Sequence, residues 1–210
     1  MIERNELRAE DCAALQRLLY SPCVSADMRL AVYDRAIMGF NIWIRPIFPQ
    51  DWQAFVPILT NAEYVRYYGE GKSFAVPDIE KRVAGRAYRN LGNVPEELKK
   101  YSPAFIFSVI DHEGVAGEVF YFRPQSEVDA GRMEIAYAIV PNRAGGGYAV
   151  KASQLVMDHL GGSFVATAHP KNIGSCRTLE KLGFILDASR LNDLKKFGEE
   201  QPRNFYIMDK

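Results

Sequence analysis

Three consecutive glycines, Gly145-Gly146-Gly147, separate a predicted strand over 133–140 from a predicted helix over 148–160. Because glycine has no Cβ, the backbone at this point can adopt positive φ angles and approach a bulky ligand closely. The predicted helix begins with N–H groups that have no partner within the helix, and its start carries a partial positive charge. Such a loop is suited to a phosphate or pyrophosphate group. The alternative that we keep open is a glycine-rich surface turn.

Two established phosphate-binding motifs do not fit this chain. The dinucleotide fingerprint requires glycine or alanine at the sixth position counted from Gly145, and that position is Val150. A Walker A loop that ends in Gly71-Lys72-Ser73 requires an earlier glycine at the position that Arg66 occupies. Both nucleotide-binding motifs are therefore excluded.

A second polar segment follows the strand predicted over 164–168. A helix is predicted from Asn172 to Leu182, and Gly183 closes it. Asn172 can cap this helix, and Ser175 lies in its first turn. Both polar groups would project just beyond the carboxyl end of the strand, where α/β sheets tend to bind ligands. On the residues alone, a helix cap with a solvated Ser175 explains the segment equally well.

The order of the predicted elements is that of a mixed α/β domain. Antiparallel strands come first and a strand–helix–strand–helix–strand succession follows, which predicts one mixed, mostly antiparallel sheet flanked by helices. This domain covers 41–210, and 1–40 forms a helical N-terminal extension that includes a helix from Asp27 to Met38. Pro46 should place its strand toward a sheet edge or a bulge. Strands are expected over 42–47, 105–110, 115–122, 133–140, 164–168, 184–186 and 204–208, and further helices over 50–60, 62–68 and 78–91.

Charge and cysteine usage argue against several classes of function. The chain has 26 basic and 26 acidic residues and no basic run, so we expect neither a nucleic acid nor a membrane surface as a partner. No apolar stretch reaches the roughly 18 residues of a transmembrane helix. The three cysteines and three histidines match no metal-site spacing, so we expect no metal, reduced thiols and a cytoplasmic location.

The two segments together resemble the GNAT superfamily of N-acetyltransferases, in particular the branch that contains the ribosomal-protein N-acetyltransferases. The loop from Pro141 to Ala149 is similar to the P-x-x-[QR]-G-x-G-Y-A pattern of that branch. The stretch from Asn172 to Phe184 is similar to its N-x-x-S-x-x-x-x-x-K-x-G-F helix. One position departs from the pattern, because Ala144 stands where the branch has glutamine or arginine. The resemblance extends over 42–208.

The resemblance implies acetyl-CoA as cosubstrate and direct attack of an amine on its thioester, without a covalent enzyme intermediate. It implies that the backbone of Ile139 and Val140 pairs with the pantetheine arm, and that Ser175 donates a proton to the departing thiolate. At the phosphate, either the neighbouring Arg143 compensates for Ala144 or the contact relies on backbone N–H groups. The remaining cofactor contacts that the resemblance implies are Gly145, Gly146, Gly147, Tyr148, Ala149 and Asn172.

A base or a water path must remove a proton from the amine before it attacks. Glu134 is our preferred base, because it matches the glutamate of the family's E-I-G-Y strand, here 134–137. Strand alternation adds an independent argument: Glu134 shares a face with Ala136 and Ala138, whose small side chains leave room for a ligand. The alternative is a glutamate at an exposed strand start. Glu118, on the preceding strand, is the second candidate base.

The other polar and aromatic candidates are assigned to structural roles, with substrate or cofactor contact as the alternative. They are Tyr64, Tyr67, Tyr68, Tyr137, Lys171 and Arg177. Three functions follow from these observations: an N-acetyltransferase acting on a protein N-terminus, a small amine or an amine-bearing antibiotic; a non-catalytic acyl-CoA-binding sensor; and an unrelated α/β domain, against which the double motif argues. We keep a homodimer as an option, because the amphipathic pattern of 1–40 fits an interface, a cover over the acceptor or a completion of the core.

Overall fold

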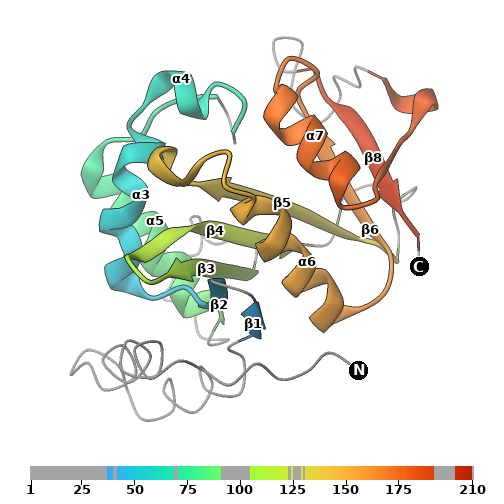
Figure 1. Cartoon of the computed structure of the whole chain (residues 1–210). Coiled ribbons are helices and arrows are strands. Elements are labelled where there is room, and N and C mark those ends of the chain that lie inside the picture. Colours follow the sequence, from blue (N-terminus) through green and yellow to red (C-terminus); the bar gives the residue numbers. More distant parts are fainter. Residues whose placement is uncertain are drawn as a thin grey trace.

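The computed structural model describes residues 37–39, 42–68, 71–90, 105–122, 124, 129, 131–191 and 202–209, so the predicted extension up to residue 36 lies outside the described residues. Within these ranges the chain forms one eight-stranded sheet in the order β1-β2-β3-β4-β5-β6-β8-β7 (Figure 1). The strands are β1 (Ile37–Gly39), β2 (Ile42–Pro46), β3 (Phe105–Asp111), β4 (Gly114–Phe122), β5 (Met133–Ile139), β6 (Phe164–Ala168), β7 (Ile185–Leu186) and β8 (Asn204–Met208). The α-helices are α3 (Trp52–Leu59), α4 (Ala62–Val65), α5 (Val76–Asn90), α6 (Tyr148–Leu160) and α7 (Ile173–Lys181). The predicted mixed α/β fold is confirmed.

The strand β1 is an addition to the predicted sheet. We expected helix up to Met38, but Ile37–Gly39 pairs antiparallel with the first residues of β2. The helix prediction is therefore wrong for Ile37 and Met38, because the ladder with a neighbouring strand outweighs the local pattern. The pairing of β1 ends at Ile44, so β1 does not reach Pro46, which lacks the N–H that a central strand would use.

The two faces of the sheet pack against different helices. Helices α6 and α7 cover one face, and α3 and α5 pack on the other (Figure 1). Along β5, Ile135 and Ile139 belong to the core under α6 and α7, whereas Ala138 belongs to the core on the α3/α5 face. The predicted division of β5 into a bulky face and a small-residue face is therefore confirmed. Strand alternation places Glu134 and Ala136 on the same side as Ala138.

The strands β5 and β6 pair in parallel only at their starts, where Met133 lies opposite Phe164 and Glu134 opposite Val165. Beyond Glu134 the ladder ends, and the rest of β5 continues to pair with β4 (Figure 1). We call this separation the β5–β6 split. Backbone N–H and C=O groups of β5 that face the split have no partner in β6, so they are available to other groups.

A buried ion pair fixes the connection from β2 to α3. Arg45 donates to the two carboxylate oxygens of Asp51 at 2.7 and 2.8 Å. The Ser108 hydroxyl and the Phe48 N–H donate to the same carboxylate at 2.6 and 2.9 Å. Because Arg45 and Asp51 are both buried, the pair depends on this full set of hydrogen bonds to offset desolvation. It anchors the start of α3, which leads into the α4 segment beside the split.

Local signals set both ends of α7. The side chain of Asn172 accepts a hydrogen bond from the Ser175 N–H at 3.2 Å, which is the predicted N-cap. At the other end Gly183 adopts a φ of 88°, and its N–H donates to the Glu180 carbonyl at 3.0 Å. A left-handed residue at this place is the usual way to end a helix, and glycine adopts it without strain. Both predicted helix ends are confirmed.

Candidate active site

The glycine loop joins the end of β5 to α6. Gly145 and Gly147 adopt φ angles of 83° and 79°, and Gly147 is the N-cap of α6. The first hydrogen bond of the helix runs from the Lys151 N–H to the Gly147 carbonyl at 3.0 Å. The N–H groups of Tyr148 and Ala149 precede this bond, and the helix therefore offers them to a ligand. The donor groups of the loop and the positive end of the helix fit a pyrophosphate.

Arg143 is engaged by two carboxylates beside the loop. Its Nε donates to Asp111 at 3.0 Å and its Nη2 to Glu113 at 2.7 Å. The Tyr148 hydroxyl also donates to Asp111 at 3.0 Å. Burial alone would raise the pKa of Asp111, but the hydrogen bonds from Arg143, the Glu113 backbone and Tyr148 outweigh it and lower the pKa. Arg143 thus ties the loop to the β3–β4 turn, while Ala144 is exposed. A phosphate contact by Arg143 stays a prediction.

The two residues expected to pair with the pantetheine arm differ in orientation. The Val140 N–H donates to the Ala116 carbonyl at 2.9 Å, which directs it toward β4. Backbone groups of successive strand residues point in opposite directions, so those of Ile139 face the β5–β6 split. The Ile139 carbonyl accepts a hydrogen bond from the hydroxyl of Tyr64, which follows α3 in the chain. Ile139 is therefore the better placed of the two residues for a ligand in the split.

Ser175 lies beside a tyrosine that sequence reasoning assigned to the core. The Tyr137 hydroxyl lies 3.2 Å from the Ser175 hydroxyl and donates to the Ser175 carbonyl at 3.2 Å. Asn172 holds the Ser175 N–H, so the cap and the serine form one unit at the start of α7. The structure thus brings together Tyr137 and Ser175 on the α6/α7 side of the split. The E-I-G-Y resemblance included Tyr137, but the strand pattern could not reveal its hydroxyl contact.

Glu134 is buried on the opposite face of the sheet, the face that α6 and α7 do not cover. Only 3% of its surface is exposed, so the alternative of an exposed strand start is wrong. The Thr167 hydroxyl donates to Glu134 at 3.2 Å. Arg203 is buried nearby: its burial lowers its pKa, and the negative charge of Glu134 partly restores it. Glu134 is therefore a buried carboxylate with polar neighbours, Thr167 and Arg203.

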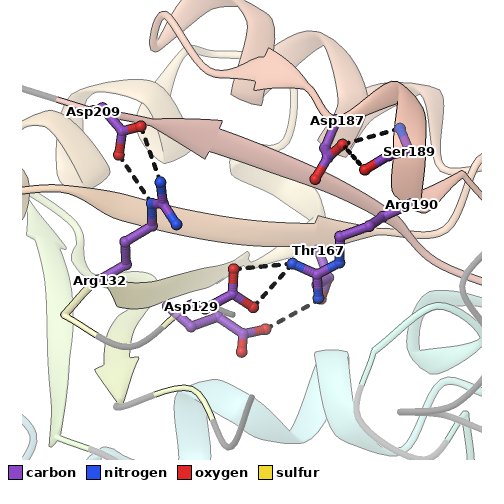
Figure 2. Close-up of polar contacts among 8 residues, drawn as sticks. Asp129, Arg132, Thr167, Asp187, Ser189, Arg190 and Asp209 are labelled. Atoms are coloured by element: carbon purple, nitrogen blue, oxygen red, sulfur yellow. Dashed lines mark hydrogen bonds and ion pairs between the residues drawn. The ribbon is translucent and has the colours of Figure 1, made fainter. Parts of the chain in front are cut away.

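A half-buried ion pair extends this polar region. One guanidinium nitrogen of Arg190 donates to both carboxylate oxygens of Asp129 at 2.9 and 3.0 Å, and Figure 2 shows this pair with Thr167. Phe205 lies opposite Thr167 in the ladder between β6 and β8, and the Arg190 guanidinium lies 3.5 Å from the centre of its ring. Figure 2 also shows the exposed pair of Arg132 and Asp209. Buried charges therefore gather on the face of β6 and β8 away from α6 and α7.

The second candidate base, Glu118, is already fully engaged. Arg86 donates to one of its carboxylate oxygens at 2.6 Å, and the Tyr68 hydroxyl donates to the other. Burial and the neighbouring Glu118 carboxylate raise the pKa of Tyr68, so its hydroxyl stays protonated and keeps donating. An amine would have to displace Tyr68 or Arg86 to reach Glu118. Glu118 is therefore poorly placed to act as the base.

His169 is a residue of the site that sequence reasoning did not select. It directly follows β6, is 6% exposed, and its ring lies 4.4 Å from the ring of Tyr67 between their centres. Its Nδ1 accepts a hydrogen bond from the Lys171 N–H at 3.0 Å. Its position directly after a predicted strand could have indicated it, because ligands of α/β sheets gather at the carboxyl ends of strands. The contact with Tyr67 could not be predicted, since it joins segments that are far apart in the chain.

Comparison with known proteins identifies the family. A family model described as an acetyltransferase (GNAT) domain matches residues 41–185. The chain belongs to the GNAT acetyltransferase family. It is therefore an acyltransferase with acetyl-CoA as the acetyl donor. No curated protein sequence matches the chain.

Solved structures share the GNAT fold at low sequence identity. A GNAT-family acetyltransferase from Bacillus anthracis is 20% identical with a TM-score of 0.65, and the match covers 83% of this chain and 98% of that one. An acetyltransferase from Salmonella typhimurium that modifies the N-terminal serine of ribosomal protein L7/L12 is 14% identical with a TM-score of 0.65, covering 84% and 99%. The microcin C7 self-immunity acetyltransferase MccE, in complex with acetyl-CoA and AMP, is 15% identical with a TM-score of 0.65, covering 92% and 99%.

In this GNAT domain the predicted cofactor residues lie on one side of the split, and the predicted base Glu134 lies on the other side with His169, which the sequence analysis had not selected. The glycine loop and Ser175 belong to the starts of α6 and α7, whereas Glu134 and His169 lie on the opposite side with Tyr67. Across the ranges that the structure describes, no helix has the length and apolar character needed to cross a bilayer. Over the same part of the chain, His, Cys, Asp and Glu side chains nowhere form a group of three suited to a metal ion.

Proposed function

We propose that this protein is an N-acetyltransferase that transfers the acetyl group of acetyl-CoA directly to a primary amine. One observation supports the proposal above the others. A hydroxyl pair, Ser175 with Tyr137, lies on the α6/α7 side of the β5–β6 split, and a buried carboxylate, Glu134, lies on the other side. A proton donor and a proton acceptor thus flank the place where the ladder between the two strands ends.

The division of roles follows from these positions. Acetyl-CoA supplies the activated thioester, and the N–H groups of Gly145, Gly147, Tyr148 and Ala149 together with Ile139 would bind and orient it. The Gly146 N–H, which the resemblance also assigned to the phosphate, donates instead to the Arg143 carbonyl at 3.3 Å. An amine entering on the Glu134 side loses its proton to that carboxylate and becomes a nucleophile. Ser175, whose hydroxyl lies 3.2 Å from the Tyr137 hydroxyl, donates a proton to the thiolate that leaves on the other side. Asn172 keeps Ser175 in place through its N–H.

The acceptor class rests on a likeness and stays a proposal. The Salmonella typhimurium structure named above modifies the N-terminal serine of a ribosomal protein. We infer a protein or peptide N-terminus as the acceptor of this chain, with a small amine or an amine-bearing antibiotic as the alternatives. The cytoplasmic location stays a prediction from the sequence.

A non-catalytic acyl-CoA sensor is the second candidate function. Two observations favour it: Ala144 replaces the basic or amide residue of the related loop, and the Tyr64 hydroxyl engages the Ile139 carbonyl in the split. Both features loosen contacts that would hold the cofactor in the position needed for turnover. Turnover therefore separates the two functions.

The test begins with thermal unfolding in the presence of acetyl-CoA, with NAD and ATP as controls. A ligand that binds only the folded state at about 100 times its dissociation constant stabilises by about 2.7 kcal/mol. Stabilisation by acetyl-CoA alone supports the cosubstrate, and the absence of any shift at millimolar acetyl-CoA contradicts the proposal.

Turnover is then measured as thiol release with a panel of amines and peptides. Ser175→Ala and Glu134→Gln should each lower kcat by about 100-fold, the usual effect of losing a proton-transfer group. Ser73→Ala and Glu80→Gln change the same residue types at exposed positions outside the proposed site and should leave kcat unchanged. Binding of acetyl-CoA without thiol release from any amine would support the sensor function.

A further inference from the structure

A group of basic and aromatic side chains surrounds His169 on the acceptor side of the split. The Tyr67 ring lies between two of them: His169 lies 4.4 Å away, and the Arg66 guanidinium lies 5.4 Å from the ring centre. Lys171 is exposed two residues after His169, and Arg203 is buried nearby. We call Arg66, Tyr67, His169 and Lys171 the basic cluster. It belongs to neither the glycine loop nor the helix starts that we assign to the cofactor.

The charges that act on His169 are all positive. Burial is the main cause of its lowered pKa, and Arg203, Lys171 and Arg66 each lower it further. Two carboxylates offset part of this charge: Glu134 acts on Arg203, and Glu63 forms an exposed pair with Arg66 at 3.5 Å, which leaves three cations against two anions. The surface beside His169 therefore carries a local excess of positive charge, although the whole chain is neutral.

The imidazole of His169 presents a fixed donor to this surface. Because Nδ1 accepts the Lys171 N–H at 3.0 Å, the neutral ring carries its hydrogen on Nε2. An Nε2–H group cannot accept a proton, so His169 is unsuited as the base for the amine in this state. It is suited to donate a hydrogen bond to an oxygen atom. A preset N–H donor among three cations is the arrangement that binds an anion.

The distance from Glu134 sets where the anion lies on the acceptor. Thr167, which donates to Glu134, lies in β6 two residues before His169, which directly follows that strand. Two residues of an extended strand span about 7 Å. The amine that Glu134 deprotonates and an oxygen bound near His169 would therefore be separated by about 7 Å, the length of a few covalent bonds.

We propose that the amine acceptor carries an anionic group, a carboxylate or a phosphate, a few bonds from its amine, and that the basic cluster binds this group. The proposal rests on the acetyltransferase function proposed above and names the class of its acceptor. Lys171 and Arg66 supply charge, His169 supplies the oriented donor, and Tyr67 supports the ring of His169. A neutral amine of the same shape lacks the charge-assisted contacts and binds more weakly.

The experiment compares probes with and without an anionic group, a phosphate in one pair and a carboxylate in the other. The full chain is saturated with CoA and titrated by calorimetry with phosphoethanolamine against ethanolamine, and with the dipeptide amide Ser-Asp against Ser-Asn. We expect the anionic member of at least one pair to bind about tenfold more tightly or better, the effect of one charge-assisted hydrogen bond. The pair with the larger preference distinguishes a phosphate from a carboxylate.

Substitutions show which residues cause the preference for the anionic probe. Lys171→Glu and Arg66→Glu should abolish the preference for the anionic probe, whereas Lys81→Glu, an equal charge change on the exposed face of α5, should leave it intact. His169→Phe keeps an aromatic ring against Tyr67 and removes the donor, so it should reduce the preference while leaving the acetyl-CoA thermal shift unchanged.

Three results would overturn the proposal: neutral probes that bind as tightly as anionic ones, no binding of any anionic probe at about 10 mM, or an equal loss of preference in Lys81→Glu. These results can be told apart from a failure of the acetyltransferase proposal itself. If acetyl-CoA does not stabilise the chain, the acetyltransferase proposal fails as well. If acetyl-CoA binds and neutral amines are acetylated equally well, only the anionic acceptor is rejected.

Discussion

The hydroxyl of Tyr137 on β5 lies 3.2 Å from the hydroxyl of Ser175 in the first turn of α7. This contact connects a strand that borders the split to the helix start that faces it. Burial raises the pKa of Tyr137 to about 12, although hydrogen bonds with Ser175 and Thr178 act in the opposite direction. The phenol therefore stays protonated at neutral pH and can support Ser175 as a proton donor.

Removing this hydroxyl tests its part in turnover. We expect Tyr137→Phe to lower kcat by about tenfold, the cost of one hydrogen bond made in the transition state, with little change in the affinity for acetyl-CoA. Because the pKa of Tyr137 lies near 12, the pH–rate profiles of the two proteins should stay parallel between about pH 6 and pH 10. Unchanged kcat in steady-state kinetics would return Tyr137 to a purely structural role.

The Arg86–Glu118 pair tests the cost of an unpaired buried charge. Both side chains are almost fully buried, at 3% and 2% exposure, so Glu118→Gln leaves the Arg86 charge without its partner. We expect the free energy of unfolding in urea to fall by about 3–5 kcal/mol. The exposed pair of Arg132 and Asp209 is the control, because Asp209→Asn should cost less than about 1 kcal/mol. Equal effects of the two substitutions would mean that Glu118 is not desolvated in the folded protein.

Ala144 allows the charge of the phosphate loop to be changed from an exposed position. In the related loop this place holds glutamine or arginine. Ala144→Arg should tighten acetyl-CoA binding by about tenfold in calorimetry, through one added charge-assisted contact to a phosphate. Ala144→Glu should weaken it, because the carboxylate repels the phosphate. If the two variants bind acetyl-CoA with the same affinity, the glycine loop is not the pyrophosphate site.

The buried imidazole of His169 links stability to pH. Burial first, and then the cations Arg203, Lys171 and Arg66, lower its folded pKa below 6.5. A lowered folded pKa means that the unfolded chain takes up the proton first as the pH falls. His169 therefore contributes stability above about pH 6.5 that is lost as the pH falls below this value.

Urea unfolding at about pH 7.5 and pH 5 measures this effect, since the interval spans the pKa of an unperturbed histidine. The wild type should lose more stability between the two pH values than His169→Gln, which cannot titrate. His112→Gln is the matched control, because His112 is exposed in the β3–β4 turn and its removal should leave the pH dependence as it is. A His169→Gln curve parallel to the wild type would contradict the burial of the imidazole.

The sequence predicted the core elements of the domain closely. The bounds of α6 and β6 agree with the expected 148–160 and 164–168, and α7 lies within its expected range with Asn172 as its cap. These features depend on neighbouring residues: glycine φ angles, helix caps and alternation of side chains act over a few positions. The β1 strand was missed, because a three-residue strand depends on the neighbour it pairs with.

The candidate site likewise combines features set by neighbouring residues with contacts between distant segments. The sequence by itself determined the glycine loop, the Asn172–Ser175 helix start and the face on which Glu134 lies, because short-range backbone geometry sets all three. Only the tertiary structure decided that Arg143 pairs with Asp111, that Arg86 and Tyr68 engage Glu118, and that His169 meets Tyr67. Such partners come from different elements, and their charges and rings meet only when the sheet brings distant segments together, a step that no local pattern encodes.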